Sequence, residues 1–387
     1  MTPDVDVAIV GAGPAGLSAA IELRRRGVGR VVVLEREQVA GGIPRHTAHL
    51  GYGARDLHRM TTGPRYAALL TRRAEKAGVE IQLGRSVQSF VGGQLFTTGA
   101  SGQSQIQAHA VVLATGVRER PRAARLVPGD RPAGVLTTGS LQQFTTLHHQ
   151  RVGTRAVVVG AEHVSFSAVL TLAHAGCKVA AMVTALPRHQ TYAPLRIATA
   201  GRHRVPIHTG VTVAEIVGRS RVEAVVLTDG RRIECDTIVF TGDWIPDHEL
   251  ARSAGLPMLS IAKSPIIDDG WHTEQSGVFA IGNLVHPAET ADVCALDGRA
   301  VAEHVMDWLT LGRWPAAVAP INVSSPIAWA AASSVGVTFR VEQFVTGSIE
   351  VSSGSEVRHR TKRKQWIPNR AYHVKGFTDC SELRFRR

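Results

Sequence analysis

The chain has 387 residues, of which 44% are hydrophobic and 20% charged, and its formal net charge is +12. A chain of this length suits two or three domains, each able to bury a core. The composition is that of a globular protein, and the lack of any run of about 18 apolar residues excludes a membrane-spanning helix. The apolar run 5–23 is broken by glycines and has no basic lead-in, so it fits a strand, a turn and a helix better than a signal peptide, and a cytoplasmic protein is expected.

Two strand–helix–strand units are predicted along the chain. In the first, the strand 5–10 leads through a glycine-rich turn into a helix over 17–26, and residues 30–35 return as a second strand. A second unit starts at residue 155 with a strand, the helix 164–175 and the strand 178–183. The other predicted elements are a helix at 64–77, a buried strand at 110–116, a hairpin region at 212–230, strands at 237–243 and 277–283, and a helix at 290–311.

The order of these elements predicts an α/β protein with two Rossmann-like, three-layer dinucleotide-binding domains, one inserted into the other. Residues 1–120 and 262–317 are expected to form the first domain, and residues 121–261 the second. Residues 318–387 are predicted to form a small, basic, β-rich region with little apolar mass for a core of its own.

The positive charge is concentrated near the C-terminal end. Residues 351–387 contain ten Lys or Arg against three Asp or Glu, a net charge of +7. No nucleic-acid motif accompanies this cluster, and Arg outnumbers Lys by 38 to 6 over the whole chain. A basic surface that faces solvent or a protein partner is therefore favoured over a nucleic-acid site.

The first turn has the pattern Gly11-x-Gly13-x-x-Gly16, and Glu35 ends the second strand, 19 residues after Gly16. Glycines at these positions permit a tight turn and a close approach of backbone N–H groups to a pyrophosphate at the positive end of the helix. Glu35 is suitably placed to accept hydrogen bonds from a ribose. Pro14 suits the first helical turn, where its missing N–H costs nothing. The turn therefore predicts a bound dinucleotide.

Two further segments indicate which dinucleotide is bound. Residues 114–121 (ATGVRERP) and 273–299 (TEQSGVFAIGNLVHPAETADVCALDGR) resemble signatures of FAD-containing flavoproteins in the pyridine nucleotide-disulfide oxidoreductase superfamily. The resemblance runs from residue 5 to about 310 and implies an FAD domain at both ends, with a nicotinamide domain between them. It also implies that Gly282-Asn283 approaches the ribityl chain and that the next helix points its dipole at the flavin ring. Asn283 stands where Asp is usual and keeps an acceptor for a ribityl hydroxyl.

The predicted FAD contacts come from all of these segments. They are Gly11, Gly13, Pro14, Ala15, Gly16, Glu35, Arg36, Gly42, Ala114, Thr115, Gly116, Gly282, Asn283 and Thr290, of which Thr290 is also a candidate helix cap. The four cysteines are scattered, and no two have the Cys-x-x-Cys spacing of a redox disulfide or a metal site. The chain thus departs from the disulfide reductases, and no metal is expected.

The second turn, which reads GAEHVS from residue 160, departs from the dinucleotide pattern. Glu162 and Ser165 stand at two of the glycine positions, where a side chain blocks a pyrophosphate and a carboxylate repels it. The strand that follows ends at Thr184 and has no acidic residue to hold a ribose. We therefore favour the interpretation that this second domain no longer binds a nicotinamide nucleotide. The alternative is NADPH, whose 2′-phosphate Arg188 and His189 are able to meet, so NAD(P)H binding stays open.

The loop 41–70 resembles that of FAD-containing subunits found beside glycerol-3-phosphate-dehydrogenase-like flavoproteins. More distantly, it resembles the α subunits of opine oxidases, hydrogen cyanide synthase and dye-linked proline dehydrogenase. His49 and the run Gly63–Ala67 match, whereas Thr47 replaces the Cys of many relatives and excludes thiol chemistry there. In this fold the loop runs toward the reactive edge of the flavin. His46 and His49 are therefore candidate catalytic bases for a substrate C–H bond, or alternatively structural histidines of the loop.

The leading interpretation is an FAD-dependent oxidoreductase that forms one subunit of a heteromeric dehydrogenase or oxidase for a small amine, amino acid or alcohol. Its electrons are expected to pass to a partner, a second flavoprotein or an iron–sulfur subunit, without nucleic acid. One rival is a self-contained NAD(P)H-dependent flavin reductase, which needs a working turn at residue 160. The other is a non-catalytic scaffold subunit in which the nucleotide is structural.

Overall fold

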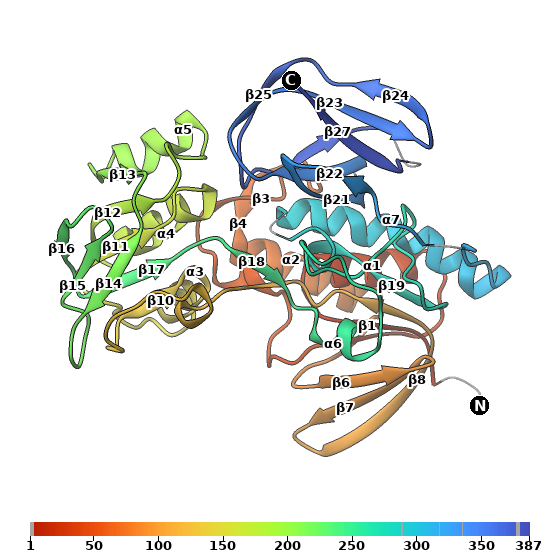
Figure 1. Cartoon of the computed structure of the whole chain (residues 1–387). Helices are drawn as coiled ribbons and strands as arrows, with labels where there is room; N and C mark the ends of the chain where they lie inside the picture. Colours follow the sequence, from red (N-terminus) through yellow and green to blue (C-terminus); the bar gives the residue numbers. More distant parts are fainter. Residues whose placement is uncertain (1–3, 288, 317, 335, 377–379) are drawn as a thin grey trace. The chain divides into compact units, whose positions relative to one another are not determined.

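The computed structural model describes residues 4–387 apart from 288, 317, 335 and 377–379. The chain forms two compact units. The first consists of Met1–Arg45, Leu50–Arg118 and Ile245–Arg387, and the second of His46–His49 and Glu119–Trp244. The second unit is thus inserted into the first, as the predicted fold class requires (Figure 1).

The first unit is built on a sheet whose central strands are parallel. β1 (Val5–Val10) lies between β2 (Val31–Leu34) and β8 (Gly102–Leu113), and Val7 stands opposite Val31 and Ala110. β1 and β2 are almost wholly buried, as expected for parallel strands that are covered on both faces. The sheet is completed by β5 (Glu80–Gln82) beside β2, by β19 (Val278–Ala280) beside β8, and by the antiparallel β6 (Ser86–Val91) and β7 (Gln94–Gly99).

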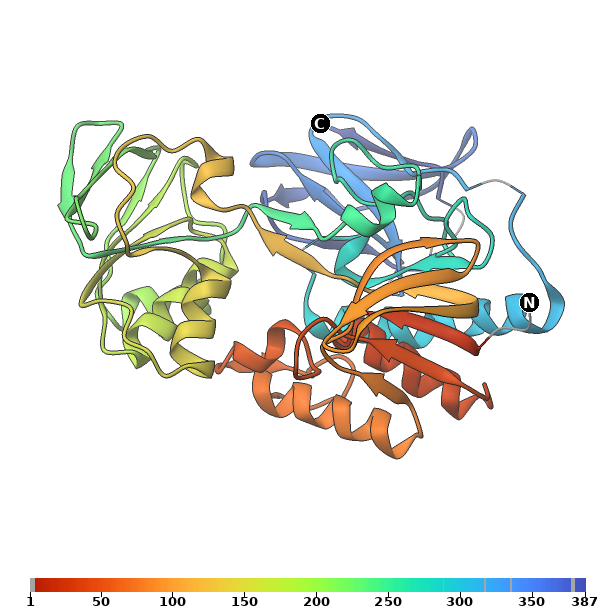
Figure 2. The same cartoon turned by 90° about the horizontal axis from the view of Figure 1, so that it is seen from below.

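Three long helices of the first unit pack together close to their predicted positions, although the first begins at Pro14, three residues before its predicted start. They are α1 (Pro14–Arg25), α2 (Gly63–Lys76) and α7 (Ala291–Leu311). Figure 2 shows α1 and α2 side by side, and α1 also contacts α7. α1 and α7 approach closely because Gly298 has no side chain: a Cβ there would lie 2.1 Å from the carbonyl oxygen of Ala15. Within the described residues, no helix combines the length and the hydropathy needed to cross a membrane.

The second unit contains a five-stranded parallel sheet in the order β10, β17, β11, β12, β13. Its centre is the predicted strand–helix–strand unit, formed by β11 (Arg155–Val159), α4 (His163–His174) and β12 (Lys178–Thr184). The other parallel strands are β10 (Val135–Thr137), β17 (Thr237–Phe240) and β13 (Ile207–Thr209). The predicted hairpin region is an antiparallel sheet of β14 (Val213–Val217), β15 (Ala224–Leu227) and β16 (Arg232–Glu234).

Residues 318–387, here called the C-terminal module, form β-strands within the first unit. One sheet contains β20 (Asn322–Val323), β27 (Glu382–Arg386), β23 (Val345–Ser353) and β24 (Glu356–Arg360), and β25 (Lys364–Trp366) also pairs with β23. The other contains β21 (Ile327–Ser333), β22 (Gly336–Val341) and β26 (Tyr372–Val374).

The expectation that the C-terminal module lacks apolar mass for a core is wrong. Phe339, Ile349, Trp366 and Leu383 are almost completely buried in one cluster. These four residues come from four different strands, in which inward-facing apolar residues are interleaved with residues that face outward. The core is therefore assembled from positions that are scattered in the sequence.

Candidate functional site

The turn that joins β1 to α1 is tightly packed on one side and open on the other. Gly11 has a φ of +109°, and a Cβ there would lie 2.4 Å from the carbonyl oxygen of Ala114. A Cβ at Gly16 would lie 2.0 Å from the carbonyl oxygen of Gly11, whereas a Cβ at Gly13 would meet nothing within 4 Å. Packing thus requires Gly11 and Gly16, and the space beside Gly13 is left for a ligand. A helix start of this kind presents backbone N–H groups to an anion.

Glu35 follows β2 and faces the same turn. One carboxylate oxygen accepts a hydrogen bond from the N–H of Ala12 at 2.8 Å, and the other accepts one from the N–H of Glu37 at 2.9 Å. Burial raises the pKa of Glu35, while the N–H of Ala12 acts in the opposite direction. A carboxylate accepts more than two hydrogen bonds, so Glu35 keeps capacity for ribose hydroxyls. Arg36 instead forms an ion pair with Asp247 at 3.0 Å.

The loop that contains Gly41 and Gly42 packs on this turn. The N–H of Gly41 donates to the carbonyl oxygen of Ala12 at 2.8 Å. Gly42 has a φ of +62°, and a Cβ there would lie 3.0 Å from the Cα of Gly13. The predicted contact residue Gly42 is therefore brought next to Gly13, at the open side of the turn.

The segment Ala114–Gly116 after β8 borders the turn as well. The N–H of Ala114 donates to the carbonyl oxygen of Val10 at 2.9 Å. The hydroxyl of Thr115 donates to the carbonyl oxygen of Asp247 at 2.7 Å, and the N–H of Asp247 donates to the carbonyl oxygen of Gly116 at 2.8 Å. These bonds fix the segment between the end of β1 and the chain that returns from the second unit.

Gly282 and Asn283 follow β19 and lie beside the first turn of α1. A Cβ at Gly282 would be 2.8 Å from the Cβ of Ala15. The amide of Asn283 is engaged with the backbone of Glu289: Oδ1 accepts the N–H at 2.8 Å and Nδ2 donates to the carbonyl oxygen at 3.1 Å. An amide oxygen accepts two hydrogen bonds, so the predicted contact with a ribityl hydroxyl has to share Oδ1. In the structure, Asn283 holds the backbone of Glu289 near the start of α7.

Thr290 stands at the N-cap position of α7, as predicted, but its side chain does not cap the helix. Thr290 directly precedes α7, but its hydroxyl donates to the carboxylate of Asp292 and accepts no backbone N–H. A carboxylate only accepts hydrogen bonds, so a neighbouring hydroxyl serves as its donor. Asp292 itself accepts the N–H of Val293 at 3.1 Å and, with its other oxygen, the N–H of Arg55 at 3.0 Å. Asp292, which no sequence motif marks, thus joins α7 to the loop after β3 (Leu50–Tyr52).

A buried ion pair involving α7 was also not predictable from the sequence. Nε2 of His286 contacts a carboxylate oxygen of Asp297, and both side chains are fully buried. The other oxygen of Asp297 accepts the N–H of Ser334 in the C-terminal module at 2.9 Å. Burial is the largest single effect and lowers the pKa of His286, but the charge and hydrogen bond of Asp297, together with the charge of Glu289, outweigh it, and the net shift is upward. A His and an Asp eleven residues apart carry no sequence signal for such a pair.

The candidate catalytic residues His46 and His49 belong to the second unit. His46 is buried and His49 is half-buried. Between them, the buried hydroxyl of Thr47 donates to Oε1 of Gln142 at 3.1 Å, and Nε2 of Gln142 donates to the hydroxyl of Ser167 at 3.2 Å. Thr47 is therefore part of a polar contact with α3 (Thr138–Gln142) and α4. The catalytic role of the two histidines stays a prediction.

The side chain of Glu162 fills the turn before α4. One carboxylate oxygen of Glu162 accepts the N–H of Ala161 at 3.0 Å, and the other lies 2.7 Å from where a Cβ at Gly242 would be. Ser165, at the third glycine position, shares a 2.6 Å hydrogen bond with the hydroxyl of Thr241. A pyrophosphate would use the N–H groups of the same turn. The carboxylate of Glu162 therefore takes the place of a bound anion.

Replacing Glu162 and Ser165 together by Gly should open this turn to a nucleotide. Removing a like charge at contact distance is worth about 1–4 kcal/mol, or about five-fold to a thousand-fold in affinity. We expect weak NADH and NADPH binding by the wild type and tighter binding by the double variant, in titrations followed by flavin absorbance. Ser165→Gly alone is the control and should bind as weakly as the wild type. Saturation of the wild type at micromolar nucleotide would contradict this interpretation.

Residues 5–307 match the model of the pyridine nucleotide-disulphide oxidoreductase family. The chain belongs to this family. It is an FAD-dependent oxidoreductase, and FAD is its expected cofactor. The residues described above fit that group, because the turn before α1 offers open space for a diphosphate and Glu35 offers a carboxylate for a ribose.

The proteins to which the chain is similar include both reductases and components of oxidases. The chain is 29% identical to the ferredoxin reductase component of chlorobenzene dioxygenase from Cupriavidus sp. (strain PS12), over 72% of this chain and 66% of that protein. It is 30% identical to the alpha subunit of sarcosine oxidase from Corynebacterium sp. (strain P-1), over 77% of this chain and 32% of that protein. It is 25% identical to one of the subunits of opine oxidase from Agrobacterium tumefaciens (strain Ach5), over 72% of this chain and 61% of that protein. The chain thus spans only part of the length of these relatives.

Solved structures share the fold. Thioredoxin reductase from T. acidophilum superimposes with a TM-score of 0.66 at 22% identity, over 78% of this chain and 97% of that one. L-proline dehydrogenase from P. horikoshii gives a TM-score of 0.63 at 21% identity, over 78% of this chain and 55% of that one. The resemblance to opine oxidase seen in the sequence is thus confirmed as a distant one, and L-proline dehydrogenase shares the fold.

Proposed function

We propose that the chain is the FAD-binding subunit of a heteromeric dehydrogenase or oxidase for a small amine, amino acid or alcohol, and that it passes electrons to a partner subunit instead of NAD(P). The observation that carries this proposal is the carboxylate of Glu162, which accepts an N–H of the second dinucleotide turn. A family member whose nicotinamide turn is filled needs a different source and destination for electrons. The relatives named as subunits of sarcosine and opine oxidases support this assignment.

FAD is expected to bind along the first turn. The N–H groups at the start of α1 would hold the diphosphate beside Gly13, and Glu35 would hold a ribose. When bound, FAD would supply the hydride acceptor for oxidation of the substrate. The chain's own contribution would be to orient FAD: Gly42 lies next to Gly13, where the diphosphate would bind, and Asn283 holds the segment before α7.

The proposal is tested by anaerobic reduction of the flavin in the complex purified from its native cells. Small primary and secondary amines, amino acids and alcohols are mixed with the complex, and the visible absorbance of the flavin is followed. We expect one of these substrate classes to bleach the flavin quickly. A firmly bound flavin that no such substrate reduces, with or without the partner, would instead favour a scaffold in which FAD is structural.

We assign the removal of the substrate proton to His46 or His49. An imidazole exchanges protons near neutral pH, and loss of a general base typically slows its step by about 10²–10⁴-fold. Either His46→Gln or His49→Gln should slow flavin reduction by that factor while the FAD content stays unchanged. His58→Gln, at an exposed residue of the same loop, is the control. If both variants reduce flavin at the rate of the wild type, neither histidine is the base.

An acidic partner is proposed to bind the basic edge of the C-terminal module. All five residues of the edge strand β24 are exposed, and the exposed Lys362 and Arg363 follow it without any ion pair to another described residue. Lys362→Glu with Arg363→Glu should lower the amount of co-purifying partner at least about tenfold, by placing like charges at the interface, and should leave FAD bound. Arg72→Glu with Lys76→Glu on α2 is the matched control. Salt-sensitive DNA binding that the first pair abolishes would contradict a protein partner.

A second function, NAD(P)H-dependent flavin reduction, is favoured by the relative that is named a ferredoxin reductase component. It requires Glu162 to turn away from the N–H of Ala161, so that a diphosphate can enter. Arg188 and His189 would then meet a 2′-phosphate. Fast bleaching of the flavin by NADPH distinguishes this function from the first.

A further inference from the structure

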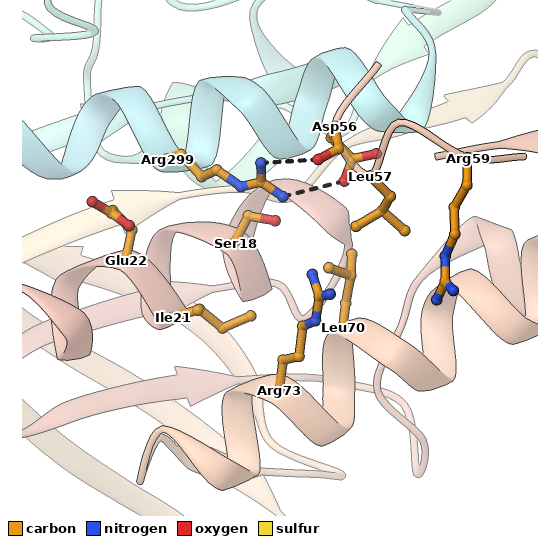
Figure 3. Close-up of a pocket in the computed structure, with 9 residues that line it drawn as sticks. All are labelled: Ser18, Ile21, Glu22, Asp56, Leu57, Arg59, Leu70, Arg73 and Arg299. Atoms are coloured by element: carbon orange, nitrogen blue, oxygen red, sulfur yellow. Dashed lines mark hydrogen bonds and ion pairs between the residues drawn. The ribbon is translucent and has the colours of Figure 1, made fainter. Parts of the chain in front are cut away.

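A pocket of about 510 Å³ lies between α1, α2, α7 and the loop that precedes β4 (Thr61–Thr62) in the first unit (Figure 3). The volume is in the range of small-molecule sites, about 300–1,000 Å³. None of its lining residues is among the predicted FAD contacts. Ile21, Leu57 and Leu70 form an apolar wall, and the other lining side chains are polar or charged.

The two acidic residues of the pocket already have cationic partners. Arg299 of α7 donates to Oδ2 of Asp56 at 3.4 Å. Glu22 of α1 pairs with Arg25 at 2.6 Å and with Arg26 at 2.8 Å, and both of these arginines lie outside the pocket lining. The carboxylates therefore leave the remaining cations of the pocket uncompensated.

These remaining cations are Arg59 and Arg73. Within the described part of the chain, neither guanidinium forms an ion pair or a side-chain hydrogen bond. In Figure 3 the guanidinium of Arg73 points from α2 into the space below Arg299, and Arg59 stands at the opposite side. The pocket thus carries two uncompensated positive charges with planar donor groups, which suit oxyanions.

Ser18 gives an independent indication of a ligand. It is 1% exposed, and its hydroxyl has no hydrogen-bond partner in the structure. In Figure 3 the hydroxyl points into the same space as Arg73. A buried hydroxyl without a partner is unfavourable, and an acceptor in the pocket would satisfy it.

We propose that this pocket binds a small phosphate monoester. Its two negative charges match the two uncompensated guanidinium groups: its terminal oxygens accept hydrogen bonds from Arg73 and Ser18, and the charge of Arg59 at the other side of the pocket adds to the attraction. The organic part of the ester would lie on the wall formed by Ile21, Leu57 and Leu70. A carboxylate carries one charge and two oxygens and matches the donor set less well. This site is separate from the proposed redox function and does not depend on it.

The test is calorimetric titration of the FAD-loaded protein with phenyl phosphate, inorganic phosphate and benzoate. Phenyl phosphate should bind saturably and at least tenfold more tightly than either other probe. Arg73→Gln should weaken its binding at least tenfold, while Arg72→Gln, at the preceding exposed residue outside the pocket, should have no effect. Ser18→Ala should also weaken binding, but it should not lower the thermal unfolding temperature of the protein without phenyl phosphate, because the hydroxyl it removes has no partner.

Three results would overturn the proposal. One is the absence of saturable binding at millimolar phenyl phosphate. The second is equal weakening by Arg72→Gln and Arg73→Gln, which would indicate a general effect of surface charge. The third is benzoate or inorganic phosphate binding as tightly as phenyl phosphate, which would contradict a phosphate ester as the ligand.

Discussion

Gly13→Glu should give a folded but colourless protein. The backbone at Gly13 has a φ of −80° that any residue adopts, and a Cβ there meets nothing within 4 Å, so the side chain is tolerated. The added carboxylate would fill the space at the start of α1 and repel the FAD diphosphate. We expect no flavin to remain after purification, measured as the ratio of visible to ultraviolet absorbance, while the circular dichroism spectrum is unchanged.

Gly13→Ala and Gly16→Ala are the matched controls. Gly13→Ala adds a methyl group without charge in open space and should retain FAD. Gly16→Ala places a Cβ 2.0 Å from the carbonyl oxygen of Gly11 and should destabilise the fold itself by about 1–3 kcal/mol or more. A Gly13→Glu protein that is as yellow as the wild type would show that FAD does not use this turn.

Asp297→Ala should be the most destabilising of the substitutions considered for the first unit. It leaves the fully buried His286 without its partner and the N–H of Ser334 without its acceptor. Removing one member of a buried ion pair costs about 3–5 kcal/mol. The loss should appear as a lower midpoint in urea unfolding. Asp307→Ala, on the same helix outside this pair, is the control. A loss equal to that of the control would contradict a structural role for the pair.

The same pair makes the stability of the wild type depend on pH. Because Asp297 raises the pKa of His286 in the folded state, the stabilisation by the protonated ring is fully present below the ordinary pKa of His. It is lost as the pH rises through the raised pKa. In Asp297→Asn, the largest of the effects that oppose burial is removed and the neutral ring is favoured despite the charge of Glu289, so stability should instead fall as the pH is lowered. Urea unfolding of both proteins between pH 5 and 9 measures this difference.

The elements with strong local patterns were predictable from the sequence. β1, α1 and β2 follow from a buried β-branched strand, a glycine turn and a second such strand, and α1 begins at Pro14 because proline is favoured in a first helical turn. The departure of Glu162 from the glycine pattern was also visible. That its carboxylate folds back onto the N–H of Ala161 was not, because a glutamate rotamer depends on its three-dimensional surroundings.

Interactions between distant segments could not be predicted from the sequence. The core of the C-terminal module collects Phe339, Trp366 and Leu383 from different short strands, and no window of the chain shows them together. The contact of Asp297 with Ser334 likewise joins a helix to a strand end 37 residues later. Thr290 carried a misleading local signal, since threonine before a helix usually caps it and here the nearby Asp292 takes the hydroxyl.

Anaerobic stopped-flow mixing of the FAD-loaded protein with NADH and NADPH tests the central claim most directly. If Glu162 fills the second turn and electrons leave through a partner subunit, millimolar nucleotide should reduce the flavin slowly and without saturation, whereas a substrate of the complex should reduce it rapidly. Rapid, saturable bleaching of the flavin at micromolar NADH or NADPH would contradict the claim and establish the chain as an NAD(P)H-dependent reductase.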